Sequence, residues 1–379
     1  MNIRLIVLAL VFASPALSLA QQDPSSWAGQ AIVLKEPGIR IGHTDPKDGE
    51  TQRYVATLKL LTYRVEADSD EFIKVRENGL SGWFPKEKAV LARDAVDYFT
   101  QTIQRSPENA LLYQRRACAW HLQGQFDLAI KDLDEAIRLS PKDHNLYHCR
   151  GIAYQAQKDY DRAIQDFTEV LRIEPKDPIA YVNRGVAHVA RKDYDRAIQD
   201  FTASIRLDPK YAQAYYNRGT VHKLQQNYDE AIEDLSKVIR LDPNHLSALL
   251  NRGWVCSQVK EYHRVIEDYT EVITLAPQDA RGYNALAWFR ATCPEQRFRD
   301  GAKAVELAKK ACELTDWKKA EYLDTLAAAY AEQGEFQEAI TVLKRALQDE
   351  EYSNTNGRLA MKRIRLHEIK EPYHENDVR

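Results

Sequence analysis

The sequence lacks the features of a nucleic-acid-binding or membrane-spanning protein. Its 53 lysines and arginines are outnumbered by 56 aspartates and glutamates, so the formal net charge is −3 and there is no basic excess for nucleic acid. The long apolar stretch at residues 5–13 is too short to cross a bilayer, which takes roughly 20 apolar residues. We therefore expect no nucleic-acid partner and no integral membrane segment in the mature chain.

Signatures of common enzyme and metal sites are also missing. The five cysteines include no C-x-x-C pair, which argues against a zinc ribbon or a thioredoxin-type motif. No glycine-rich phosphate loop, H-E-x-x-H or G-x-S-x-G occurs. These absences predict a protein that is not an enzyme and that needs neither a cofactor nor a metal ion.

The first twenty residues have the layout of a secretory signal peptide. Arg4 precedes the apolar stretch, and Ser18 and Ala20 stand where a small-x-small cleavage site is expected. No cysteine follows Ala20, so we expect no lipid anchor at the new N-terminus. Residues 1–20 are predicted to be removed and the mature protein to be exported, to the periplasm or the cell exterior. The alternative is an uncleaved anchor or a buried helix.

From residue 107 onward the sequence repeats with a period of 34 residues. Four kinds of residue keep this step, a strong sign of a repeat architecture. The columns are Pro107, Pro141, Pro175, Pro209, Pro243 and Pro277; Gly151, Gly185, Gly219 and Gly253; Phe126, Tyr160, Tyr194, Tyr228 and Tyr262; and Ala129, Ala163, Ala197 and Ala231. Each repeat has apolar residues at helical spacing on both sides of a short turn, which predicts two helices. The small glycines and alanines would let those helices approach closely.

This pattern resembles the tetratricopeptide repeat (TPR) family. The motif Y-x-N-R-G-x-A stands at residues 181–187 and Y-D-R-A-I-Q-D-F at residues 194–201. The resemblance implies a mainly α solenoid, a right-handed superhelix of helix hairpins. About seven repeats are expected over residues 108–350, the sixth irregular because Ala287 replaces the glycine and a longer turn follows. A linking or capping helix is expected at 93–107, and a capping helix and tail at 351–379, with the helix at 358–370.

The segment before the repeats has the composition of strands. Strands are predicted at residues 31–35, 55–65, 72–76 and 80–84, with an Asn78-Gly79 turn joining the last two. Residues 72–90 resemble bacterial SH3 domains, which implies a small SH3-like β-barrel over residues 25–92. Phe72 and Trp83 are candidates for a binding surface on it. A groove for proline-rich peptides is not expected, because such domains carry a tryptophan where this chain has Phe72 or Ile73.

Two columns of charged residues run through the repeats. Arginines recur on the first helix of each repeat and aspartates on the second. They are Arg116, Arg150, Arg184, Arg218 and Arg252, and Asp132, Asp166, Asp200, Asp234 and Asp268. The functional interpretation is a basic strip for acidic partners. The one-to-one match favours the structural interpretation, one ion pair between the two helices of each repeat.

An asparagine column precedes the arginines and is the main candidate for binding. Peptide-binding TPR proteins use an asparagine here, on the concave face, to hydrogen-bond a ligand's backbone, so the resemblance implies the same role. Neighbouring residues on the same helical face would supply apolar contacts. The predicted peptide-binding residues are Val182, Asn183, Val186, Tyr216, Asn217, Thr220, Lys223, Leu250, Asn251 and Trp254. Only Lys223 is basic, so a clamp for acidic C-termini is not supported.

These features predict an exported interaction scaffold that binds a protein or an extended peptide in the groove of the solenoid. The alternative is a cell-envelope targeting protein whose SH3-like barrel holds peptidoglycan while the solenoid is structural. An exposed aromatic pair at Phe72 and Trp83 would favour the alternative, and a buried pair would favour the scaffold.

The five cysteines are predicted to be free thiols. Cys293 ends a first helix and Cys312 lies late on the next, so they should stand roughly 15 Å apart along the axis, whereas a disulfide needs Cα atoms within about 7 Å. Cys118 and Cys149, on neighbouring first helices, are a marginal pair. Thiol titration of the unfolded mature protein should therefore count five reactive groups. A count of three or fewer would contradict the prediction.

Overall fold

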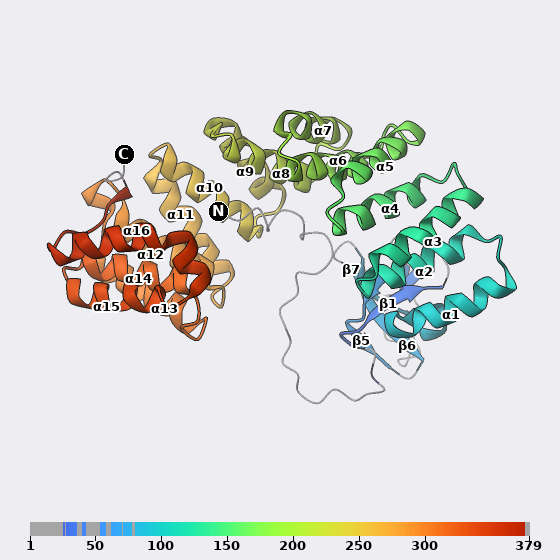
Figure 1. Ribbon diagram of the computed structural model, residues 1–379, viewed down its shortest axis with the longest axis horizontal. Coiled ribbons are helices and arrows are strands. Elements are labelled where there is room, and N and C mark those ends of the chain that lie inside the picture. Colours follow the sequence, from blue (N-terminus) through green and yellow to red (C-terminus); the bar gives the residue numbers. More distant parts are fainter. Residues whose placement is uncertain are drawn as a thin grey trace. The chain divides into compact units, whose positions relative to one another are not determined.

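The computed structural model describes Ser26 and residues 28–35, 40–42, 54–57, 62–69, 71–77 and 80–375. The chain divides into two compact units, Met1–Pro209 and Lys210–Arg379 (Figure 1). The first unit contains the described strands and helices α1–α7, and the second contains α8–α16. The predicted signal peptide at 1–20 lies outside the described residues.

The described strands form two antiparallel sheets. One sheet has the order β4 (Thr62–Arg64), β1 (Ala31–Leu34), β8 (Ala89–Leu91). The other has the order β3 (Tyr54–Thr57), β2 (Arg40–Gly42), β7 (Leu80–Pro85), β6 (Phe72–Glu77), β5 (Ala67–Asp68). β6 and β7 pair as expected, with Glu77 opposite Leu80. The predicted turn residues between them, Asn78 and Gly79, lie outside the described residues.

The prediction of a single strand at residues 55–65 is wrong. The structure has two strands there, β3 and β4, and they belong to different sheets. β3 pairs with β2, whereas β4 pairs with β1. Because those two partners lie in separate sheets, one continuous strand could not pair with both, and the chain changes sheet between Thr57 and Thr62.

Strand β1 is buried on both of its faces. Ile32 and Leu34 point into the core of the β region, together with Ile73, Val75 and Phe84. Val33 faces the opposite way, as alternation along a strand requires. It packs in a second cluster with Val90 of β8 and with Phe99 of α1 (Ala92–Arg105). The β region and the first helix therefore share a core, and α1 is the expected capping helix.

The helices α2–α15 form seven consecutive pairs, the number that the 34-residue period predicts. In the first unit the pairs are α2 (Ala110–Leu122) and α3 (Phe126–Leu139), α4 (His144–Ala156) and α5 (Tyr160–Ile173), and α6 (Pro178–Ala190) and α7 (Tyr194–Leu207). In the second they are α8 (Ala212–Leu224) and α9 (Tyr228–Leu241), α10 (Leu246–Gln258) and α11 (Tyr262–Leu275), α12 (Ala280–Thr292) and α13 (Gly301–Glu313), and α14 (Ala320–Glu332) and α15 (Phe336–Ala346).

A left-handed turn residue separates the helices of every pair except the sixth. It stands two positions before the second helix, at Gly124, Lys158, Lys192, Gln226, Lys260 and Gly334, with φ between 63° and 88°. The equivalent position of the sixth pair is Pro294, whose ring fixes φ near −65°. The chain cannot make the same turn there, and it inserts a 3₁₀ turn, η4 (Gln296–Phe298), before α13. This explains the irregular sixth repeat.

The terminal helix is longer than expected. α16 spans Glu350–Glu368, whereas the sequence predicted residues 358–370. The side chain of Asp349 caps its start by accepting a hydrogen bond from the backbone N–H of Tyr352 at 2.8 Å. Tyr352 is buried in the core of the second unit, which holds the first turn of the helix in place.

Glycines on the first helices allow close contact with aromatic rings on the second helices. A Cβ added to Gly185 would lie 2.6 Å from the ring of Phe201, and one added to Gly151 would lie 2.8 Å from Phe167. Both distances are shorter than van der Waals contact. This confirms that the glycine column exists because any side chain there would push the two helices apart.

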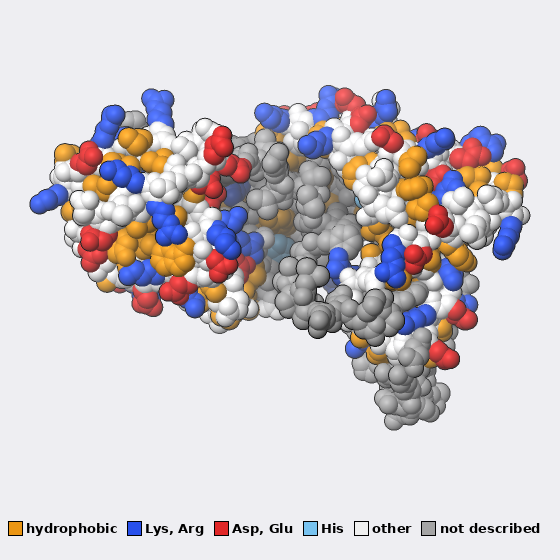
Figure 2. Space-filling view, turned by 60° about the horizontal axis from the view of Figure 1, so that its bottom comes forward, with side chains coloured by type: hydrophobic (Ala, Val, Ile, Leu, Met, Phe, Trp, Pro, Cys, Tyr) orange, Lys and Arg blue, Asp and Glu red, His pale blue; other side chains and the backbone are white. Residues whose placement is uncertain are grey.

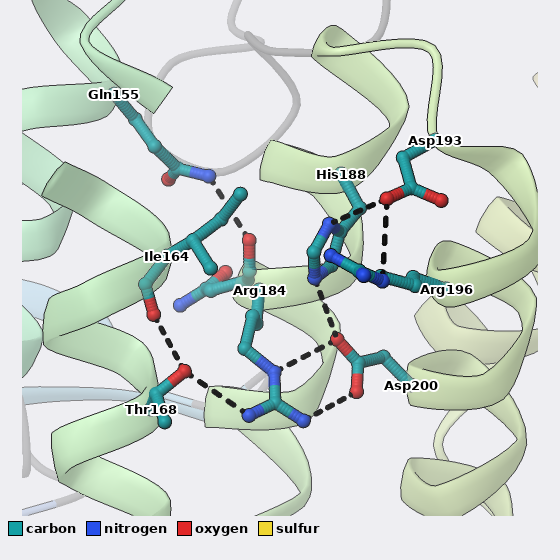
Figure 3. A network of polar contacts seen from close by, with 9 residues as sticks. Gln155, Ile164, Thr168, Arg184, His188, Asp193, Arg196 and Asp200 are labelled. Atoms are coloured by element: carbon teal, nitrogen blue, oxygen red, sulfur yellow. Dashed lines mark hydrogen bonds and ion pairs between the residues drawn. The ribbon is translucent and has the colours of Figure 1, made fainter. Parts of the chain in front are cut away.

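The arginine and aspartate columns form one bidentate ion pair in each of five helix pairs. Arg184 donates from Nε and Nη2 to the two carboxylate oxygens of Asp200, at 2.9 and 2.7 Å (Figure 3). The same two bonds join Arg116 to Asp132, Arg150 to Asp166, Arg218 to Asp234 and Arg252 to Asp268, at 2.6–3.0 Å. The structural interpretation of these columns is therefore confirmed.

The arginines also contact the helix pair before their own. Nη1 of Arg184 donates to Thr168 on α5 at 3.2 Å, and Nη1 of Arg150 donates to Asp134 on α3 at 2.6 Å. The hydrogen bonds to Asp200 raise the pKa of Arg184 above its ordinary value. One guanidinium thus joins three helices, two of its own pair and one of the preceding pair.

The five cysteines are free thiols in the structure, and Cys256, Cys293 and Cys312 are buried. Cys118 and Cys149 are in contact, and their hydrogen bond raises the pKa of the Cys118 thiol well above its usual range. The marginal pair identified in the sequence is therefore the pair that the fold brings together.

Replacing Arg184 with alanine should lower the free energy of unfolding by about 3 kcal/mol, because the Asp200 carboxylate would stay buried without its partner. The matched control is Arg206→Ala, on the exposed side of α7, which should change stability by less than about 0.5 kcal/mol. Urea denaturation of the full chain, followed by circular dichroism, measures both. Equal effects of the two substitutions would contradict the structural role of the ion pair.

Candidate functional site

The predicted binding residues of the first unit lie on α6, and two of the three are buried. Val182 is fully buried and the Asn183 side chain is engaged with α4, where its Nδ2 lies 2.6 Å from Nε2 of His148. The backbone carbonyl of Asn183 accepts a hydrogen bond from Gln155 at 3.0 Å. Val186 is half-buried. Val182 and Asn183 therefore pack between neighbouring first helices and are not open to a ligand.

Asn217, in the second unit, is also buried. It is 6 % exposed, and its Oδ1 accepts a hydrogen bond from Gln213, one turn earlier on α8, at 2.9 Å. The expectation of an open asparagine row is thus corrected: Asn183 and Asn217 are buried, and Asn251 alone of the three is half-exposed. The amide of Asn183 is used in packing against α4, and that of Asn217 is bonded within its own helix.

The remaining predicted residues of the second unit come together in one cluster. Lys223 on α8 donates from Nζ to Oδ1 of Asn251 on α10 at 2.7 Å, and Nδ2 of Asn251 donates to the hydroxyl of Tyr216 at 3.1 Å. The Lys223 ammonium also lies 4.7 Å from the ring centre of Trp254. We call Tyr216, Lys223, Asn251 and Trp254 the Trp254 cluster.

Burial changes the electrostatics of the Trp254 cluster. Desolvation lowers the pKa of Lys223 from 10.5 to about 8, and desolvation raises the pKa of Tyr216. The Lys223 ammonium lies against a neutral amide oxygen, that of Asn251, and against the ring of Trp254. The cluster is a half-buried cation beside a tryptophan, with hydrogen-bonding groups on both sides.

The other two predicted residues of this surface support the cluster. Thr220 donates to the backbone carbonyl of Tyr216 at 2.8 Å, one turn earlier on α8. Leu250 is half-buried and packs against the main core of the second unit. Tyr228, from α9, meets the edge of the Trp254 ring at 6.2 Å between ring centres. The indole is thus fixed on one side and half-exposed on the other.

Sequence reasoning missed Trp288. It stands 34 residues after Trp254, in the same column of the repeat, on α12. Its indole N–H donates to Glu375, near the C-terminus, at 2.8 Å. The column was the available signal, but it was overlooked because the sixth repeat departs from the pattern at Ala287 and Pro294.

Phe72 and Trp83 lie on the outer face of their sheet. Trp83 stands opposite Lys74 in the pairing of β6 with β7, and Ile73 and Phe84 fill the inner face instead. Both aromatic residues are half-buried, and the ammonium of Lys74 lies 6.0 Å from the Trp83 ring centre. The pair is neither an open cluster nor a core pair, so it decides neither of the two functional interpretations.

Among the described residues, no group of three or more histidine, cysteine, aspartate or glutamate side chains lies close enough together to hold a metal ion. His188 lies between Asp193 and Asp200, at 3.8 and 3.9 Å, beside the Arg184 ion pair (Figure 3). Burial lowers the pKa of His188, so the neutral form is favoured.

Basic and acidic side chains are interspersed over the visible surface (Figure 2). None of the described helices has the length and apolar character of a membrane span.

Comparison with known proteins identifies the repeats. Three segments match the tetratricopeptide repeat family, at residues 150–212, 212–245 and 320–349, and residues 119–158 match the related TPR repeat. No curated protein sequence matches this chain.

Two solved structures share the fold. A tetratricopeptide repeat protein from Parabacteroides merdae is 18 % identical, with a TM-score of 0.52, over 68 % of this chain and 98 % of its own. The C-terminal part of a TPR repeat-containing protein from Cytophaga hutchinsonii is 20 % identical, also with a TM-score of 0.52, over 62 % of this chain and 94 % of its own. The chain therefore carries tetratricopeptide repeats, at residues 119–245 and 320–349, in a mainly helical solenoid that follows a small β region.

Proposed function

We propose that the protein is a non-catalytic interaction scaffold that binds an extended peptide segment of a partner protein at the Trp254 cluster. The observation that carries the proposal is the partly exposed indole of Trp254 beside the Lys223 ammonium and the Asn251 amide, on two adjacent first helices. Tryptophan and tyrosine dominate protein interfaces because they bury a large area and keep a polar edge. The cluster contains both residue types, as Trp254 and Tyr216.

The polar groups of the cluster suit a peptide backbone. Lys223 has three N–H donors and the Asn251 amide has two, and one of each is used inside the cluster. The others can donate to carbonyl oxygens of an extended chain. A single lysine is too little for a clamp on an acidic C-terminus, so affinity should depend on shape and apolar contact and fall little with salt.

We further propose that residues 25–92 form an SH3-like domain and that the protein is exported. The paired strands β6 and β7, with Ile73 and Phe84 inside and Trp83 outside, support the first part. The arrangement of residues 1–20 in the sequence supports the second. Mass spectrometry of fractionated cells should find a chain that begins near Gln21 in the secreted or periplasmic fraction, and a chain that begins at Met1 in the cytoplasmic fraction would argue against export.

Trp254→Ala should weaken partner binding at least tenfold, because the indole supplies most of the apolar contact at the cluster. Peptides selected from a random library on the immobilised full chain serve as probes, and fluorescence polarisation measures their affinity. Asn227→Ala, in the exposed turn between α8 and α9, is the control and should bind normally. If Trp254→Ala binds the selected peptides as tightly as the control, the cluster is not the site.

Affinity for the same peptides should fall about three- to fourfold between pH 7 and pH 9. Lys223 loses its proton near pH 8, and a charged donor is worth about 1 kcal/mol more than a neutral one. Lys223→Met keeps the side-chain length without the charge, and its affinity should stay constant over this range. A wild-type affinity that does not change with pH would show that the ammonium does not contact the peptide.

A further inference from the structure

The chain's own C-terminal segment lies across the first helices of the last repeats. After α16, Lys370 has φ 61°, and the N–H of Glu371 returns to the carbonyl of Leu366 at 2.9 Å, which turns the chain back. Residues 371–374 form neither helix nor strand. His374 reaches Glu332 at the end of α14, at 2.9 Å, and Glu375 accepts the hydrogen bond from Trp288 on α12.

The ring of Tyr373 contacts one aromatic and one cationic side chain, Trp288 and Arg363. The guanidinium of Arg363, on α16, lies 5.6 Å from the ring centre of Trp288 and 5.4 Å from that of Tyr373. The two rings are 6.1 Å apart. These distances are typical of cation–π and tilted ring contacts. The tail therefore places one aromatic and one acidic side chain, two residues apart, on the same tryptophan.

The groups that receive Tyr373 are held by contacts outside the tail. Arg363 donates to Asp324 on α14 at 2.7 Å and is 7 % exposed, and it also approaches the hydroxyl of Tyr352 at 3.4 Å. Glu332, which receives His374, is fixed by Arg299 at 2.8 Å. The receiving surface is thus built by α12, α14 and α16, and Arg363 and Glu332 keep polar partners that do not belong to the tail.

We propose that the surface around Trp288 and Arg363 is a binding site for an extended segment of the type Tyr-x-Glu, and that the C-terminal tail fills it as an internal ligand. A partner segment of the same chemistry would displace the tail. Trp288 belongs to the same repeat column as Trp254. The site nevertheless has its own residues and its own ligand, so this proposal can be tested independently of the one for the Trp254 cluster.

The test uses the full chain with Tyr373→Ala and Glu375→Ala, which detach the tail, and a fluorescent peptide of residues 369–379. The double variant should bind this peptide in fluorescence polarisation. Wild type should bind it at least roughly tenfold more weakly, because its tail competes at an effective concentration of about 1 mM. Adding Trp288→Ala to the double variant should abolish binding, whereas adding Trp254→Ala should leave it unchanged.

A peptide with alanine in place of Tyr373 is the matched control and should not bind. If the double variant loses its helical circular dichroism signal, full-length Glu375→Gln replaces it, with the same order of affinities and a smaller difference. Equal binding by wild type and tail variant, no binding by either, or binding that survives Trp288→Ala would each overturn the proposal. The tail would then be only a structural cap.

Discussion

The bidentate pair between an arginine and an aspartate is the interaction that joins the two helices in five of the seven helix pairs. It fixes the distance and angle between the two helices of a repeat, and the third guanidinium nitrogen sets the position of the preceding repeat. A buried pair is costly unless its geometry is good, so it contributes specificity more than raw stability. The glycine column makes this geometry reachable, since it lets the first helix approach the aromatic ring on the second.

The parts of the fold that could be predicted are those fixed within one repeat. Helix pairs, the close approach at Gly185 and the Arg184–Asp200 pair all follow from residues fewer than 34 positions apart, so they recur in the sequence. The burial of Asn183 could not be read in this way, because it depends on the packing of α6 against α4 of the preceding repeat. The change of sheet between β3 and β4 and the contact of Trp288 with Glu375 link positions with no periodic signal.

The candidate binding surface can also be traced to one column of the repeat. A column that holds Val186 and Thr220 in earlier repeats holds Trp254 and Trp288 in later ones. All four side chains are only partly buried, so the column accepts residues of different size. A partly exposed column of this kind is where a repeat protein can acquire a preference for a partner.

The two-sided burial of β1 has a consequence for the order in which the chain acquires its structure. Val33 pairs with Val90, so β1 cannot complete its sheet until residues nearly sixty positions later have been synthesised. Each helix pair, by contrast, needs only its near neighbours and can form as soon as it leaves the ribosome. The opposite face of β1 must also wait for Phe99. The contacts of β1 are therefore incomplete until β8 and α1 have both been synthesised.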